Sequence, residues 1–161
     1  MKTKPLRIIE TLPLFATTKW VECSTRNITA IDLFARHYSS DERKRSLWLR
    51  HGFAGPGEKM TLITPNHDAL FAWRLERHRQ DELTGIECSV FRNESAERSS
   101  VLIQDAMLLA RLRWGDVPMF TFVDARKVRS RNPGYCFKCA GWKHTGHTGK
   151  GLHVLQYVDR T

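Results

Sequence analysis

The chain has 161 residues, with 26 Lys and Arg against 17 Asp and Glu, so its formal net charge is +9 at pH 7 with His neutral. This length fits a single domain over residues 1–161. A content of 41% hydrophobic and 10% aromatic residues argues against long disorder. The sequence has no apolar run of the roughly 18–20 residues that a membrane span needs, and its start is a poor signal peptide, so we expect a cytoplasmic protein. The positive charge favours an acidic partner, with nucleic acid first.

The sequence has four cysteines, Cys23, Cys88, Cys136 and Cys139. Without a signal peptide, a disulfide framework is not expected. Cys136-x-x-Cys139 precedes His144 and His147, and thiolates and imidazoles at such spacing could hold zinc. The gap between the two pairs is shorter than in a zinc finger, and the flanking residues fit a short helix with two small packed side chains. We therefore predict no metal site and keep zinc as an alternative.

The first third of the chain predicts two strands and a helix. The expected elements are strands at 6–9 and 17–22, a helix at 27–38, a polar loop or helix end at 39–46 and a turn at 52–57. In the helix, Ile28, Ile31 and Tyr38 recur at helical spacing, and Thr25 or Asn27 could cap it. The segment from Trp48 to Phe53 is ambiguous.

The remaining two thirds predict strands around one long helix. The expected elements are strands at 59–64, 69–75 and 86–92, a helix at 99–113, a strand at 119–124, a short helix at 134–140, a glycine-rich turn at 144–151 and a last strand at 152–158. Strands joined through a helix should run parallel, and the others antiparallel. The prediction is one α+β domain with a mixed, mostly antiparallel twisted sheet flanked by helices.

This order of elements resembles the GNAT acyltransferases over roughly residues 28–158. The matching pieces are the strand 86–92, Arg98-Ser-Ser-Val101, the helix to Arg113, the strand 121–124, and the segment 132–142 ending in Ala-Gly-Trp. The resemblance implies acetyl-CoA or a related acyl donor, whose pyrophosphate would lie against Arg98, Ser99, Ser100 and Val101. The chain departs from the family here, because Glu97-Arg-Ser-Ser-Val101 holds none of the glycines that usually form this loop.

Shorter motifs resemble the Mom-type phage DNA-modification proteins. They are His37-Tyr38-Ser39, the serines that open the long helix, Asp124 at a strand end and Tyr135 in the short helix. The resemblance implies modification of the adenine amino group in double-stranded DNA with an acyl- or glycine-derived donor, which protects DNA from restriction. It makes His37, Tyr38, Ser100, Asp124 and Tyr135 the candidate catalytic residues, and leaves a metal ion open as a further cofactor.

Each candidate also has a structural interpretation. His37 could be a general base or a metal ligand, or a partly exposed histidine. Asp124 could accept a proton from an amine, or pair with Arg126 or Lys127. Tyr135 could protonate a leaving thiolate, as tyrosines near this position do in GNAT enzymes, or fill space.

The basic residues predicted to contact DNA are Arg126, Lys127, Arg129, Arg131 and Lys143. An extruded base could stack on Tyr38, Trp48 or Trp142. Two further functions remain open from the sequence. One is an ordinary acyl-CoA-dependent N-acetyltransferase acting on a small amine or a protein, and the other is a non-catalytic nucleic-acid-binding domain with a Cys/His zinc site.

Overall fold

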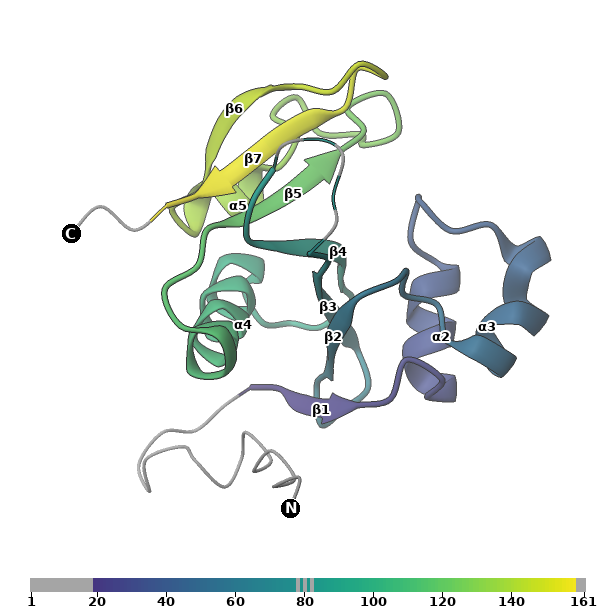
Figure 1. Ribbon diagram of the computed structural model, residues 1–161. Coiled ribbons are helices and arrows are strands. Elements are labelled where there is room, and N and C mark those ends of the chain that lie inside the picture. Colours follow the sequence, from purple (N-terminus) through teal and green to yellow (C-terminus); the bar gives the residue numbers. More distant parts are fainter. Residues whose placement is uncertain (1–18, 78, 80, 82, 159–161) are drawn as a thin grey trace.

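The computed structural model describes residues 19–77, 79, 81 and 83–158 (Figure 1). Its strands are β1 (Val21–Cys23), β2 (Glu58–Ile63), β3 (Ala69–Leu75), β4 (Ile86–Asn93), β5 (Met119–Val123), β6 (Lys143–His147) and β7 (His153–Tyr157). Its helices are α2 (Ile28–Ala35), the 3-10 turn η1 (Glu42–Lys44), α3 (Arg45–His51), α4 (Ser99–Trp114) and α5 (Tyr135–Cys139). None of these helices is long and apolar enough to cross a membrane.

The strands form one seven-stranded sheet in the order β1-β2-β3-β4-β5-β7-β6. Neighbouring strands are antiparallel except β4 and β5, which are parallel and are joined through the long helix α4. A parallel pair needs such a crossover, because a short turn cannot return the chain to the same end of the sheet. The predicted α+β class and mixed sheet are confirmed.

Helices cover both faces of the sheet, with α4 and α5 on one face and α2 and α3 on the other (Figure 1). Three tryptophan side chains anchor α4. The indole N–H groups of Trp20 and Trp73 donate to helix carbonyls, at 2.9 and 3.0 Å, and that of Trp142 lies 3.1 Å from the sulfur of Met107. These bonds let large aromatic side chains be buried without leaving a polar group unsatisfied. These contacts hold the middle of α4 against β3 and against the residues that precede β1 and β6.

The structure differs from the predicted elements in two segments. Residues 143–147 form strand β6, where a glycine-rich turn was expected. Residues 42–51 form η1 and α3, where a polar loop or helix end and an ambiguous segment were expected. In both segments the apolar pattern from which secondary structure is predicted is weak, because few of their side chains are buried. Every residue of β6 except Gly146 is exposed, since β6 is an edge strand, and Trp48 is the one buried residue of α3.

Smaller differences concern element ends. The first described helix ends at Ala35 and not at Tyr38, although Asn27 caps it as expected, accepting a bond from the Ala30 N–H at 3.1 Å. Of the expected strand 17–22, the structure shows β1 from Val21. The expected strand 6–9 lies outside the described residues.

Strands β4 and β5 pair only over their first residues, from Ile86 against Met119 to Cys88 against Thr121. Beyond this point they separate. The cause is a bulge in β4, because Trp73 of β3 pairs with Cys88 while Ala72 pairs with Val90, so that Ser89 is an extra residue. A bulge bends its strand and increases the local twist, which carries the end of β4 away from β5.

Gly85 allows the paired end of β4 to lie close to the connection before β5. Its φ is +105°, and a Cβ there would lie 1.9 Å from the carbonyl oxygen of Pro118. That carbonyl accepts the hydrogen bond that starts β4, from the Ile86 N–H at 2.9 Å. A side chain at position 85 would therefore push β4 and β5 apart at their paired end.

Gly85→Ala should lower the free energy of unfolding by roughly 3–5 kcal/mol, since strain from a positive φ adds to the clash with backbone. Gly115→Ala is the matched control, because its φ of +77° is similar and a Cβ there meets nothing within 4 Å. The control should lose only about 1–2 kcal/mol. Urea unfolding of both variants measures the difference, and equal losses would show that the contact with Pro118 is unimportant.

Candidate active site

A cavity of about 300 Å³ lies where β4 and β5 separate. Its walls come from the residues that follow α2, from β4, from β5 and from the segments that follow β5. The lining residues are His37, Tyr38, Ser39, Glu87, Cys88, Ser89, Val90, Phe91, Thr121, Phe122, Val123, Asp124, Lys127, Phe137 and Leu152. Ligands of open sheets often bind at the carboxyl ends of adjacent parallel strands, and the cavity lies at this place.

The facing edges of the two strands are available to a ligand. The outer edge of β4 pairs with β3 as far as Asn93, and the outer edge of β5 pairs with β7 as far as Val123. Their inner edges carry no ladder bonds to each other beyond Cys88 and Thr121. Unpaired backbone groups can bind an extended chain of amides in the way that a sheet edge binds a strand. The pantetheine arm of coenzyme A has this chemistry.

His37 and Tyr38 close one end of the cavity. Their rings stack with centroids 4.4 Å apart. The backbone N–H of Ser39 donates to Nδ1 of His37 at 3.2 Å, and the Ser39 hydroxyl lies 2.7 Å from the same atom. Burial and the nearby Arg92 lower the pKa of His37 from 6.5 to about 4. His37 is therefore neutral at pH 7, with Nδ1 accepting hydrogen bonds and the proton on Nε2.

The hydroxyl oxygen of Tyr38 accepts a long hydrogen bond, 3.4 Å, from the backbone N–H of Asp124. This contact joins the segment after α2 to the end of β5 across the cavity. Burial raises the pKa of Tyr38, so the phenol stays protonated at neutral pH. Because the oxygen accepts this bond, the phenolic proton is free to be donated to a ligand.

Asp124 lies at the end of β5 with its carboxylate held by Arg126. The guanidinium donates from Nε at 3.0 Å and from Nη2 at 3.2 Å, and the Arg126 backbone N–H donates at 3.1 Å. These bonds hold the pKa of Asp124 below its usual value. The pairing of Asp124 with Arg126, which the sequence left open, is thus formed. While this ion pair is present, Asp124 is a weak proton acceptor.

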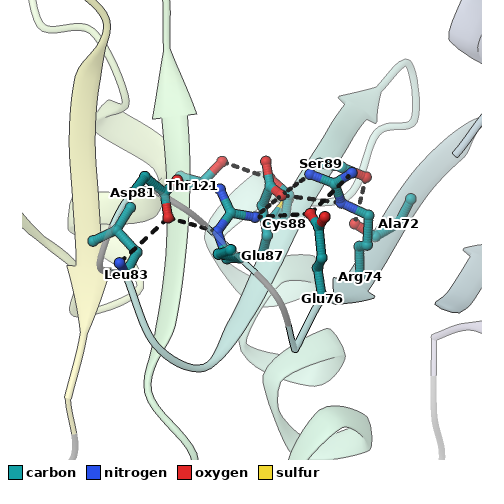
Figure 2. Close-up of polar contacts among 10 residues, drawn as sticks. Ala72, Arg74, Glu76, Asp81, Leu83, Glu87, Cys88, Ser89 and Thr121 are labelled. Carbon is teal, nitrogen blue, oxygen red and sulfur yellow. Dashed lines mark hydrogen bonds and ion pairs between the residues drawn. The ribbon is translucent and has the colours of Figure 1, made fainter. Parts of the chain in front are cut away.

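Glu87 forms the floor of the cavity and is buried between two arginines. Its Oε2 accepts bonds from Nη2 of Arg74 at 2.6 Å and from Nη1 of Arg79 at 3.0 Å. Figure 2 shows Arg74 and Glu76 on one side of Glu87 and Asp81 on the other. The guanidinium of Arg79 also lies 4.7 Å from the centre of the Phe120 ring, in cation–π geometry. Glu87 is therefore paired with two guanidinium groups and fixed in place.

Asn93 builds the loop between β4 and α4 in place of glycines. Its Oδ1 accepts from the backbone N–H of Ser95 at 2.9 Å, and its Nδ2 donates to the carbonyl of Glu97 at 2.8 Å and to the Ser99 hydroxyl at 2.9 Å. One side chain thus fixes the conformation that leads into α4.

The start of α4 has some of the features of a phosphate-binding site. Arg98 is the exposed N-cap residue, its own side chain caps nothing, and the first-turn N–H groups of Ser99 and Ser100 point out of the helix start. Val101, also predicted here, is partly exposed and its N–H is bonded to the Arg98 carbonyl at 3.1 Å. A phosphate would thus meet one guanidinium and two N–H groups, and no glycine-rich cradle.

The predicted catalytic residues fall into two groups. His37, Tyr38 and Asp124 line the cavity, whereas Ser100 and Tyr135 do not. Tyr135 is 61% exposed and lies near Cys139 and Arg98, where the thiol raises its pKa. The structure therefore places Tyr38, and not Tyr135, as the tyrosine of the cavity.

The basic residues predicted to contact DNA lie on the surface after β5 and at the start of β6. Lys127 lines the cavity, and Arg126, Arg129, Arg131 and Lys143 are exposed. Sequence reasoning did not find the wall formed by Ser89, Phe122 and Leu152. Those positions carry no chemical signal, because their role comes from the separation of two strands.

We compared the chain with known proteins. No family model matches the sequence, and no curated protein matches it. Among solved structures, an acyl-CoA N-acyltransferase from Pseudomonas aeruginosa superimposes with a TM-score of 0.54 at 12% identity, covering 87% of this chain and 99% of that chain. The fold is thus that of the GNAT acyltransferases, as the sequence predicted. The closer resemblance to Mom-type proteins stays a prediction.

His37 should make stability depend on pH. Its pKa is about 4 in the folded protein and 6.5 in the unfolded chain, so the unfolded chain binds more protons between these values. The free energy of unfolding should therefore fall by up to about 3 kcal/mol as the pH drops from 7 to 4. Urea unfolding at several pH values should show a smaller decrease in His37→Gln. His51→Gln, at the exposed end of α3, should keep the wild-type decrease, and parallel curves for all three proteins would contradict the assignment.

Proposed function

We propose that the protein is an N-acyltransferase that uses a coenzyme A thioester and carries out the transfer in the cavity between β4 and β5. The observation that carries this proposal is the separation of two parallel strands beside a protonated tyrosine. Val90 and Phe91 on one side and Phe122 and Val123 on the other offer unpaired edges to the pantetheine arm. Arg98 at the start of α4 would meet the phosphates.

Tyr38 is the proposed proton donor. A bound thioester supplies an activated acyl carbon and a thiolate leaving group. The Tyr38 hydroxyl would give its proton to that sulfur as the carbon–sulfur bond breaks, while the carbon–nitrogen bond to the acceptor forms. The proton that the acceptor nitrogen loses restores the phenol, so the transfer is balanced. Neutral His37, whose proton is on Nε2, would orient the acceptor by donating a hydrogen bond.

The charges around the cavity favour an acceptor nitrogen that is uncharged before it reacts. Both carboxylates that line the cavity are already bonded to arginines, Glu87 to Arg74 and Arg79, and Asp124 to Arg126. Lys127 adds a positive charge at the wall. An alkylammonium would be repelled and would find no free carboxylate to take its proton. The exocyclic amine of a nucleobase is neutral at pH 7 and avoids both difficulties.

We further propose double-stranded DNA as the acceptor, with the adenine amino group as the target. Support comes from the net charge of +9 and from the exposed arginines 126, 129 and 131 next to the cavity. Chemistry on a base requires the base to leave the stack. The stacked rings of His37 and Tyr38, the latter 37% exposed, offer a platform for it. A small amine or a protein as acceptor is the competing outcome of the tests below.

Tyr38→Phe should lower the rate of thiol release from acetyl-CoA with DNA as acceptor by about 100-fold, the effect of losing a general acid. Binding of acetyl-CoA, measured by calorimetry, should stay within about 2-fold, because the hydroxyl acts on the leaving group. Tyr135→Phe is the matched control and should keep its rate. Mass spectrometry of the digested DNA should show an acylated adenosine.

Three results would contradict these assignments. A rate that falls in Tyr135→Phe but not in Tyr38→Phe would move the proton donor to α5. Thiol release with small amines but not with DNA would agree with the assignment as an acyltransferase and contradict the assignment of DNA as the acceptor. Absence of acetyl-CoA binding in the wild-type protein would overturn the choice of donor.

Arg129→Ala with Arg131→Ala should weaken binding to duplex DNA and make its salt dependence less steep. Each phosphate contact contributes about 0.9 to the slope of log K against log salt, so the slope should fall by about 1.8. Lys44→Ala with Arg50→Ala removes the same charge from exposed positions on η1 and α3 and should change the slope little. Equal changes in the two double variants would show that binding follows net charge and not this surface.

A further inference from the structure

Three histidines meet on the edge hairpin formed by β6 and β7. His144 and His147 lie on β6, and His153 begins β7 directly opposite His147. One nitrogen from each ring lies within 4.8 Å of those of the other two. Among the described residues, no other group of three or more His, Cys, Asp or Glu side chains comes together in this way.

Two of the three rings, those of His144 and His153, have a nitrogen whose lone pair can bind a metal ion. The Nε2 of His144 lies 2.9 Å from the carbonyl oxygen of Gly146, which can only accept, so this nitrogen holds the proton and Nδ1 keeps its lone pair. Histidines that bind metals commonly donate their other N–H to a backbone carbonyl in this manner. The Nδ1 of His153 is buried and has no hydrogen-bond partner among the described residues.

The close packing of the three rings also suits a cation. A neutral imidazole is the form that binds a metal ion. Three rings packed with centroids 4.6–4.8 Å apart would repel one another if all were protonated.

We propose that His144, His147 and His153 bind one divalent transition-metal ion of the zinc class. Three imidazoles without a carboxylate suit Zn²⁺, Ni²⁺ or Cu²⁺ and do not suit Mg²⁺ or Ca²⁺. Zinc–nitrogen bonds of 2.0–2.1 Å in a tetrahedron place ligand atoms about 3.4 Å apart, so the rings need to close by about 1.4 Å. The fourth position stays open to water or to a ligand.

The site differs from the zinc set that the sequence offered. Cys136 and Cys139 lie on α5 and take no part in the histidine cluster, and burial raises the pKa of Cys136. His153 instead completes the set, because pairing of β6 with β7 brings it beside His147. Its spacing in the sequence gave no sign of this.

A bound ion would also hold the rim of the cavity. His153 pairs with Val123 of β5, and Leu152, the residue before it, lines the cavity. Bonds from one ion to both strands would fix the turn end of the hairpin next to the separated ends of β4 and β5. The inference is independent of the acyl transfer proposed above, since it rests on other residues and needs no donor.

The test uses the full chain without an affinity tag. Calorimetry with Zn²⁺ should show one ion per chain, and Zn²⁺ should raise the midpoint of thermal unfolding. His147→Gln should weaken binding by at least about 100-fold, since it removes a ligand and not merely a supporting group. His144→Gln should do the same, and both side chains are exposed, so the variants should fold. His51→Gln on α3 is the matched control and should bind as the wild type does.

Co²⁺ distinguishes the histidines from the cysteines. The proposed site predicts a cobalt spectrum without thiolate charge-transfer absorption, and unchanged binding in Cys139→Ser. Loss of binding in Cys139→Ser, or Zn²⁺ binding that persists in both histidine variants, would overturn the proposal. Absence of any binding by the wild-type chain would overturn it as well.

Discussion

The extra residue that Ser89 inserts into β4 is the constraint on which the rest of the site depends. It bends β4 immediately after the last pair with β5, Cys88 against Thr121. The strands cannot close again, because β4 is held by β3 as far as Asn93 and β5 by β7 as far as Val123. Backbone groups left unpaired between them need partners from water or from a ligand. The cavity is therefore a built feature of the sheet and not a packing defect.

Burying the charged side chain of Glu87 costs free energy, and neighbouring side chains offset this cost. Removing Glu87 from water is unfavourable, and a buried ion pair recovers this only with good geometry and further hydrogen bonds. Two guanidiniums supply them, and the Phe120 ring covers Arg79. The arrangement forms a cluster of paired charges on β3, β4 and the segment that follows β3 (Figure 2). It holds β3, β4 and the connection between them in fixed relation beneath the cavity.

The sequence predicted most of the strands, the long helix and the parallel crossover, because these follow from apolar periodicity and from a helix placed between strands. It did not predict the order of strands in the sheet, in which β7 lies between β5 and β6. Short motifs singled out His37, Tyr38 and Asp124, and these residues line one cavity. Their catalytic roles stay a prediction. The sequence could not predict that Tyr38 reaches Asp124 across 86 positions, or that Tyr135 lies outside the cavity, because both depend on how α2 and α5 pack. Strand β6 was missed since an exposed edge strand needs no apolar alternation. The histidine cluster was missed for a related reason: its third member comes from cross-strand pairing.

Electrostatics around the cavity connects the net charge to the chemistry. Each carboxylate at the wall is matched or exceeded by arginine, with Glu87 between two guanidiniums and Asp124 bonded to one. Lys127, whose charge acts on Asp124, and the exposed arginines 129 and 131 add further positive charge at this surface. Because a cleft with low-dielectric walls concentrates the field, the mouth of the cavity attracts polyanions and repels ammonium groups. In the DNA modification proposed above, the same field would hold a phosphate backbone at the rim while a neutral amino group enters, so that proposal derives both binding and acceptor choice from one distribution of charge.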